Sequence, residues 1–345
     1  MRRSVKLILA LLVAFGLVAA ACGDDGDGGE GEDGFLACQV TDTGGIDDAS
    51  FNATAWKGME QAEEELGVEI KFVESQSEVD FVPNIQSMVA EGCDVVVTVG
   101  FLLGDATAEQ APANPDVKFV GLDQAAVEGA DNSRGYFYAT NEPSFLAGYL
   151  SAGMTTTGKI ATFGGIDIGA PVTDFMDGFV WGAEYHNAQK GTSVEVLGWN
   201  PDTKEGVFVG NFESKDDGRS AGQSFADEGA DIVLPVAGPV GEGTAALAIE
   251  RGDMMIIGVD ADWFETVPSA KSVILTSVLK KLDESVFDSI KAAQDGSWTG
   301  GLFFGGGGLT PYHDLDADVP QELKDEVDDL ASQINLGSLD VSNAG

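Results

Sequence analysis

The sequence predicts an α/β fold with two doubly wound parallel-sheet lobes. From residue 35 onward, short β-rich runs alternate with amphipathic helical segments, a pattern typical of parallel sheets with helical crossovers. About ten strands are expected, which is more than one sheet of ordinary width holds, so two lobes are the simpler arrangement. The chain has 46 glycines among 345 residues, which favours many tight turns between strands and helices.

The expected strands are short and mostly apolar. They cover residues 36–42, 68–74, 94–100, 117–122, 135–139, 159–163, 194–199, 231–236, 254–260 and 272–277. Between the first two, residues 51–66 place apolar side chains on one helical face, and Gly67 ends that segment. A second helical stripe covers residues 286–293 and stops at Gly296. The alternation therefore continues along nearly the whole chain.

The first 34 residues predict export and attachment to a membrane. A basic head and an apolar run over residues 7–18 form a secretory signal peptide within residues 1–21. The run is shorter than the roughly 20 residues that a membrane span needs. Cys22 directly follows three alanines, and this arrangement resembles a bacterial lipobox. The resemblance implies that Cys22 is acylated. The alternative is ordinary secretion with Cys22 as a free thiol. Residues 22–34 continue with only Gly, Asp and Glu after that cysteine, which predicts a flexible tether.

Charge and motif content exclude several function classes. The net charge is −40, from 58 acidic and 18 basic residues, and such a surface repels nucleic acid and anionic lipids. We therefore expect no nucleic-acid partner, and membrane contact only through the lipid anchor. The Gly-rich segment 238–243 has the wrong spacing for a dinucleotide site, and Asp314, Asp316 and Asp318 lack the Gly and Glu of a calcium loop. We expect no cofactor and no metal.

Acidic residues follow the ends of several expected strands. They are Asp42, Asp105, Asp123, Asp167 and Asp260. Ligands of open parallel sheets bind beyond the carboxyl ends of the strands, so these acids predict a cleft rich in hydrogen-bond acceptors between the lobes. Vicinal sugar hydroxyls or ring N–H groups suit such acceptors. The alternative for each acid is a role as a cap of the following helix.

Two cysteines remain after Cys22. Cys38 begins the first expected strand and Cys93 lies just before the third. Those strands are neighbours in a doubly wound sheet, so the two side chains lie near one edge. Outside the membrane they either form a disulfide or stay as two buried thiols.

Several motifs together resemble the basic membrane protein (PnrA-like) family, the substrate-binding lipoproteins of ABC importers. The opening match is residues 40–52, VTDTGGIDDASFN, and further matches run in family order at 100–103, 141–148, 258–262 and 275–280. The resemblance implies the type I periplasmic-binding fold, with two lobes joined by a three-segment hinge near 139–143, 258–262 and 302–308. Lobe I would hold residues 35–140 and 262–302, and lobe II residues 141–261 and 303–345.

The resemblance also implies a site, since in that family aromatic rings sandwich a purine base while acids and a lysine hold its edge and the ribose. The positions carried over are Phe51, Asn52, Asp42, Asp123, Asp260 and Lys280. In the family a second aromatic ring stacks on the base. The matching position in this chain is Leu234, so that ring is missing, and Trp263 or Phe264 is the expected substitute for it. Gly238 lies in the turn whose amides we expect to face the ligand.

These implications define the expected function. We expect a monomeric, lipid-anchored receptor on the extracytoplasmic face of the bacterial membrane, which binds a nucleoside, with purines favoured, and presents it to an ABC permease and ATPase. The sequence has only two histidines and no hydrolase motif, so we expect no enzyme. The alternatives are the same fold binding a sugar or another neutral polar solute for uptake or sensing, and a surface carbohydrate hydrolase with paired carboxylates.

Overall fold

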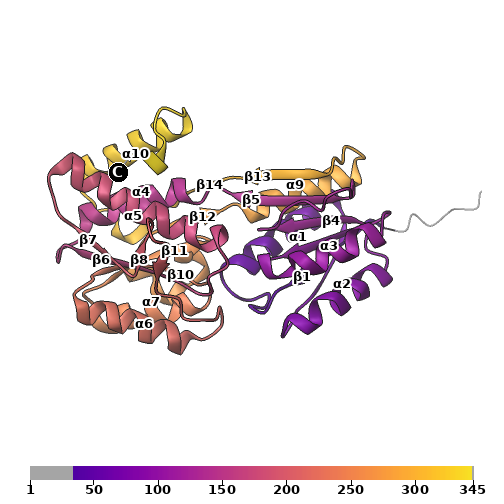
Figure 1. Ribbon diagram of the computed structural model, residues 1–345, viewed down its shortest axis with the longest axis horizontal. Coiled ribbons are helices and arrows are strands. Elements are labelled where there is room, and N and C mark those ends of the chain that lie inside the picture. The colour runs from indigo at the N-terminus through magenta and orange to yellow at the C-terminus, as the bar shows by residue number, and fades with distance from the viewer. Residues whose placement is uncertain (1–33, 344–345) are drawn as a thin grey trace, which may run out of the picture. The chain divides into compact units, whose positions relative to one another are not determined.

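Two six-stranded sheets organise the chain in the computed structural model, which describes residues 34–343 (Figure 1). The first sheet has the strand order β13-β5-β4-β3-β1-β2, and all its strand pairs are parallel. Its strands are β1 (Leu36–Thr41), β2 (Glu69–Val73), β3 (Val95–Val99), β4 (Lys118–Leu122), β5 (Ser133–Tyr138) and β13 (Gly301–Gly305). Its helices are α1 (Phe51–Leu66), α2 (Phe81–Ala90), α3 (Gly104–Ala113) and α9 (Leu282–Gln294). We call this sheet with its helices the first lobe.

The second sheet has the order β14-β12-β11-β10-β6-β7, and only the pair of β12 and β14 is antiparallel. Its strands are β6 (Lys159–Gly164), β7 (Glu195–Leu197), β10 (Ile232–Val236), β11 (Met255–Asp260), β12 (Ile274–Lys280) and β14 (Gly307–Leu309). Its helices are α4 (Asn141–Met154), α5 (Ala170–Lys190), α6 (Lys215–Glu228), α7 (Val240–Arg251), α8 (Trp263–Thr266) and α10 (Gln321–Asn335). We call this group the second lobe, and the predicted α/β class is confirmed.

Smaller elements complete the described part. A short antiparallel hairpin, β8 (Trp199–Asn200) and β9 (Glu205–Gly206), follows β7. The 3₁₀ turns are Glu78–Asp80, Phe101–Leu103, Pro268–Val273, His313–Leu315 and Val341–Asn343. This hairpin, β13 and β14 were not predicted, because their glycine-rich or two-residue strands carry no apolar alternation.

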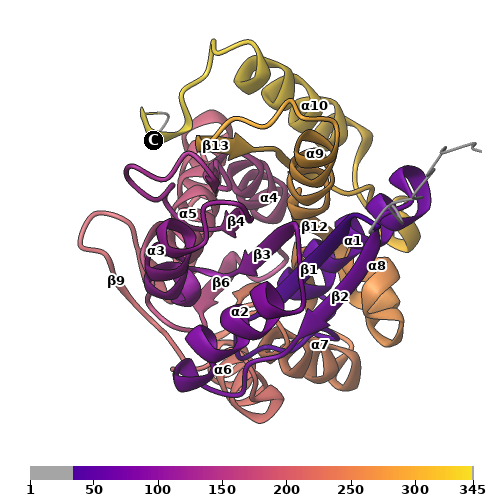
Figure 2. The same cartoon turned by 90° about the vertical axis from the view of Figure 1, so that its right-hand side faces the viewer.

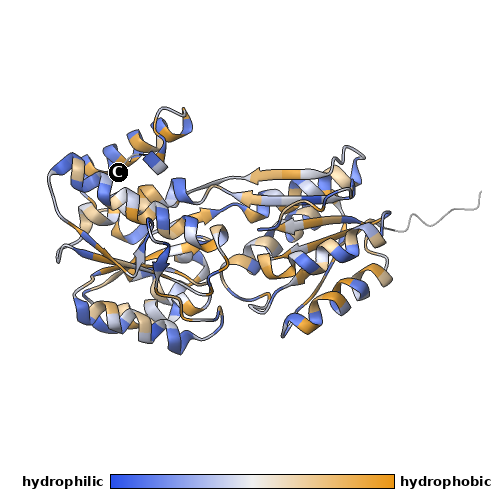
Figure 3. Cartoon of the chain, viewed as in Figure 1, coloured by the Kyte–Doolittle hydropathy of each residue, from blue (hydrophilic) through white to orange (hydrophobic). Residues whose placement is uncertain are grey.

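Helices cover both faces of each sheet, as the continuous apolar central strands require, whereas the edge strands β2 and β13 of the first sheet stay partly exposed. In the first lobe, α1 and α9 cover one face and α2 and α3 the other (Figure 2). In the second lobe, α4, α5 and α10 cover one face, and α6, α7 and α8 the other. Figure 3 shows hydrophobic colour on the strands and hydrophilic colour on outer helix faces. The expected helix at 51–66 is confirmed, and Gly67 ends it at a φ of 69°.

The strand β12 corrects the expected lobe boundary. We expected residues 262–302 to return to the first lobe, but β12 pairs with β11 and β14 in the second sheet. Only α8 and one 3₁₀ turn separate β11 from β12, and this short crossover keeps the two strands neighbours. The chain passes between the sheets near residues 140, 281 and 306, so the second passage follows β12 instead of lying at 258–262.

Cys38 and Cys93 form a disulfide with a Cα–Cα distance of 6.0 Å. The bond links β1 to the turn before β3, which is the neighbouring strand, as the doubly wound order predicted. The predicted signal peptide, Cys22 and the tether up to residue 33 lie outside the described residues. Among residues 34–343, no helix is long and apolar enough to cross a membrane.

Candidate ligand-binding site

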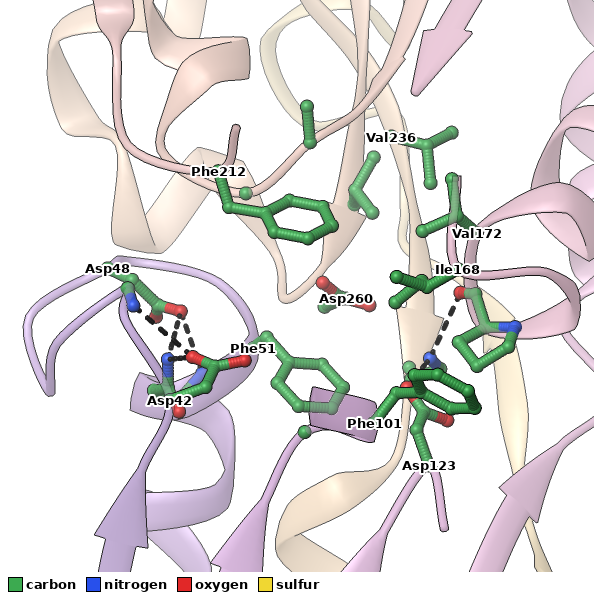
Figure 4. Close-up of a pocket in the computed structure, with 18 of the residues that line it drawn as sticks. Asp42, Asp48, Phe51, Phe101, Asp123, Ile168, Val172, Phe212, Val236 and Asp260 are labelled. Atoms are coloured by element: carbon green, nitrogen blue, oxygen red, sulfur yellow. Dashed lines mark hydrogen bonds and ion pairs between the residues drawn. The ribbon is translucent and has the colours of Figure 1, made fainter. Parts of the chain in front are cut away.

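A cavity lies where strand ends of both lobes meet (Figure 4). From the first lobe it is lined by Asp42, Gly44, Asp48, Phe51, Asn52, Gly100, Phe101 and Asp123. From the second lobe it is lined by Ile168, Pro171, Val172, Phe175, Phe212, Val236, Ala237, Gly238, Pro239, Val259, Asp260 and Lys280. Most of the residues singled out in the sequence therefore share one cavity.

Three of the predicted site residues do not line the cavity. Asp105 is exposed in the first turn of α3, because the 3₁₀ turn after β3 carries the chain past the strand end. Asp167 is exposed, and its Oδ1 accepts a bond from the Gly169 amide at 3.3 Å, as a turn residue does. Leu234 is fully buried in the core facing α4 and α5. These three expectations are corrected.

Lys280 sits at the end of β12 and forms a buried ion pair with Asp123, which follows β4. Its Nζ lies 2.6 Å from Asp123 Oδ2, and the two side chains are 2% and 5% exposed. The ammonium also lies 5.1 Å from the centre of the Phe51 ring and 5.4 Å from that of Phe175. Burial raises the pKa of Asp123, and the charge of Lys280 opposes that rise. The pair joins the two lobes at the base of the cavity.

Asp260 ends β11 in a conformation that non-glycine residues rarely adopt. Its φ is 66°, and Asp123 at the corresponding strand end has a φ of 56°. Such strained residues concentrate at functional sites. Ser50 Oγ lies 3.0 Å from both Asp260 Oδ2 and the carbonyl oxygen of Val259, so this hydroxyl connects the first lobe to the second. Burial raises the pKa of Asp260 to about 6, with the charge of Lys280 opposing it.

Asp48, which was not among the predicted site residues, organises the loop between β1 and α1. Its carboxylate accepts bonds from the backbone amides of Ser50, Asn52 and Ala53 and from the Asn52 side chain, at 2.8 to 3.2 Å. Amides in the first turn of a helix have no partner within the helix, so Asp48 caps α1. Burial raises the pKa of Asp48 to about 7. Because Asp48 lies two residues before the N-cap Ser50, the usual N-cap pattern does not predict this role.

Aromatic rings enter the cavity from both lobes. Phe51 and Phe101 come from the first lobe, and Phe175 and Phe212 from the second. Figure 4 shows the rings of Phe51 and Phe212 projecting into the space from opposite sides. Phe212 lies in the segment between β9 and α6 and packs on Gly165, where a Cβ would come within 2.3 Å of the ring. The second lobe thus supplies a ring although position 234 lacks one.

The expected substitutes for that ring lie elsewhere. Trp263 is buried in the core and donates its Nε1 hydrogen to the carbonyl of Val259 at 3.0 Å. Phe264 stacks on His313 with 4.1 Å between ring centres, and it does not line the cavity. Phe212 follows no strand or helix pattern, so the sequence offered no signal for it.

Comparisons with known proteins agree with this architecture and confirm the family resemblance. Residues 35–305 match the family described as ABC transporter substrate-binding protein PnrA-like. An uncharacterized lipoprotein of Pyrococcus abyssi is 30% identical over 315 residues, covering 86% of this chain and 74% of that protein. The ABC transporter nucleoside-binding protein BmpA of Lactococcus lactis is 29% identical over 367 residues, covering 99% of both.

A solved structure shows the same fold. The ABC transporter solute-binding protein of Aeropyrum pernix K1 superposes with a TM-score of 0.77 at 26% identity, covering 89% of this chain and 92% of that one. Substrate binding for an ABC transporter is a non-enzymatic role. The chain belongs to the PnrA-like family of ABC transporter substrate-binding proteins.

Proposed function

We propose that the protein binds a nucleoside, with purines favoured, in the cavity between its lobes and delivers it to an ABC permease and ATPase. The observation that carries this proposal is the combination of opposed rings, Phe51 and Phe212, with the acceptors Asp123 and Asp260 in one cavity. A base is a flat aromatic surface that suits the rings. The vicinal hydroxyls of ribose are donors that suit buried carboxylates.

The contacts between the lobes support a closing motion around the ligand. The Lys280–Asp123 pair and the Ser50–Asp260 contact both join residues of different lobes directly beside the cavity. A ligand that adds contacts to both lobes shifts the population toward such a closed state. The name of the Lactococcus lactis relative, a nucleoside-binding protein, agrees with the ligand class proposed for this chain.

Replacing either opposed ring tests the stacking. Phe51→Ala and Phe212→Ala should each weaken adenosine binding by about 1–3 kcal/mol, because each removes a surface on which the base stacks. Titration calorimetry measures the change. Phe264→Ala is the matched control, since that ring packs on His313 away from the cavity. Unchanged affinity in both cavity variants would contradict stacking between the lobes.

We also propose that Cys22 is acylated and holds the protein on the extracytoplasmic face of the membrane. The match to a family of ABC transporter substrate-binding proteins and to a relative named as a lipoprotein supports this location. Cys22→Ser should abolish the incorporation of radiolabelled lipid and release the protein from the membrane fraction, because the hydroxyl does not replace the thiol in lipoprotein processing. Lipid incorporation into the Cys22→Ser variant would refute the anchor.

A further inference from the structure

The segment that carries Phe212 is fixed to the end of β6. Three backbone hydrogen bonds of 2.8 to 3.1 Å join residues 207–210 to Gly164, the last residue of β6, and to Gly165, which follows it. Phe208 forms an isolated parallel bridge with Gly164. The segment therefore continues the second sheet at this point, although its sequence has no periodic pattern.

Two rings of this segment lie where glycines leave room for them. A Cβ on Gly164 would come within 2.5 Å of the Phe208 ring, and a Cβ on Gly165 within 2.3 Å of two ring carbons of Phe212. Ordinary contacts between carbon atoms are about 3.5–4.0 Å long. The Cβ on Gly165 would also lie 2.9 Å from the carbonyl oxygen of Asn211, so the ring and the backbone next to it would both have to move.

Gly165 lies outside the cavity, and its own backbone does not require glycine. It is not among the residues that line the cavity. Its φ is not positive, so an alanine at this position meets no strain from a left-handed conformation. An alanine would therefore affect a ligand in the cavity through the displaced ring, because it neither touches the ligand nor strains its own backbone.

Resting on the proposed nucleoside binding, we infer that Gly165 is a positioning residue that holds the Phe212 ring in the place where it stacks on the base. Phe212 projects into the cavity from the side opposite Phe51 (Figure 4). A ring that is already in position when the ligand arrives loses less conformational freedom on binding than a ring on a loose segment. Glycine at position 165 supplies the room that this position needs.

A double-mutant cycle between residues 165 and 212 tests the inference by titration calorimetry. Gly165→Ala should weaken adenosine binding about tenfold, because the displaced ring no longer stacks on the base. In the Phe212→Ala background the same change should weaken binding about twofold or less, because the ring through which it acts is gone. A merely structural role of Gly165 would lower the affinity by the same factor in both backgrounds.

Gly222→Ala is the matched control. Its new Cβ would lie 2.7 Å from the Thr244 side chain, so it also crowds a neighbour in the second lobe. Neither residue lines the cavity. This variant should bind adenosine with the affinity of the parent protein.

Denaturant unfolding keeps the test decisive if Gly165→Ala is too unstable for calorimetry. Gly165→Ala should unfold at a lower denaturant concentration than the parent protein. The double variant should unfold close to Phe212→Ala, because the missing ring leaves space for the new methyl group. An equal loss of stability in both backgrounds would then overturn the inference.

The affinities separate this inference from the proposed function. A parent protein that binds adenosine, together with Gly165→Ala at undiminished affinity or an equal loss of affinity in both backgrounds, overturns the role of Gly165 and leaves the proposed function standing. A parent protein that does not bind nucleosides refutes both.

Discussion

Lys280→Met is expected to lower the free energy of unfolding by about 3–5 kcal/mol at pH 8, because it leaves buried carboxylates without their cation. Lys280 Nζ lies 2.6 Å from Asp123, and both side chains are almost fully buried. The charge of Lys280 also opposes the raised pKa of Asp260. Met has a similar length, so the change removes the charge and leaves little empty space.

The loss should be smaller at pH 5. Without the cation, the pKa of Asp123 and that of Asp260 rise further above their values in the unfolded chain. A carboxyl with a raised folded-state pKa binds its proton more tightly in the folded protein, so stability falls as pH rises through that pKa. Denaturant titrations at pH 5 and pH 8 measure the difference. Lys281→Met is the control, since Lys281 pairs with Glu284 at the surface and should change stability by less than about 1 kcal/mol.

Equal losses for Lys280→Met at both pH values would contradict this account. That result would show that the ammonium contributes through packing alone, without neutralising Asp123. A loss as large in Lys281→Met would show that any charge change at the end of β12 destabilises the protein.

Removing the disulfide is expected to cost about 2–4 kcal/mol of stability and to leave nucleoside affinity unchanged. The bond closes a loop with a sequence separation of 55 residues, for which chain entropy alone gives about 4 kcal/mol. The double variant Cys38→Ala, Cys93→Ala should therefore unfold at lower denaturant concentration. Neither cysteine lines the cavity. A reducing agent should reproduce the loss in the parent protein and have no effect on the double variant.

A change in nucleoside affinity in the double variant would contradict this prediction. A weaker complex in the double variant would mean that the first lobe loses its shape without the bond. Unchanged stability would mean that the unfolded chain gains no freedom when the disulfide is absent.

Much of this architecture follows from local patterns in the sequence. The apolar strands and the helix at 51–66 are recovered because each is a periodic run with a defined end. The acids that line the cavity, Asp42, Asp123 and Asp260, stand directly at strand ends, and the geometry of parallel sheets brings such positions together. The proximity of Cys38 and Cys93 follows from the same neighbour relation, whereas the choice between a disulfide and two buried thiols came only from the structure.

What the sequence could not supply depends on irregular connections. Asp105 and Asp167 also follow strands, but a 3₁₀ turn and a tight turn carry them to the surface. β12 was placed in the wrong lobe because the expected boundary came from the resemblance, and the short crossover before β12 gave no local pattern that could correct it. Phe212 comes from a segment without periodic structure, and only the tertiary packing on Gly165 brings its ring to the cavity.

The most direct measurement is titration calorimetry of the purified parent protein with adenosine, guanosine and glucose. The account predicts that a purine nucleoside saturates one site per chain and that glucose gives no heat of binding. Saturation by glucose without any response to nucleosides would contradict the proposed ligand, and the cavity would then belong to a sugar receptor of the same fold.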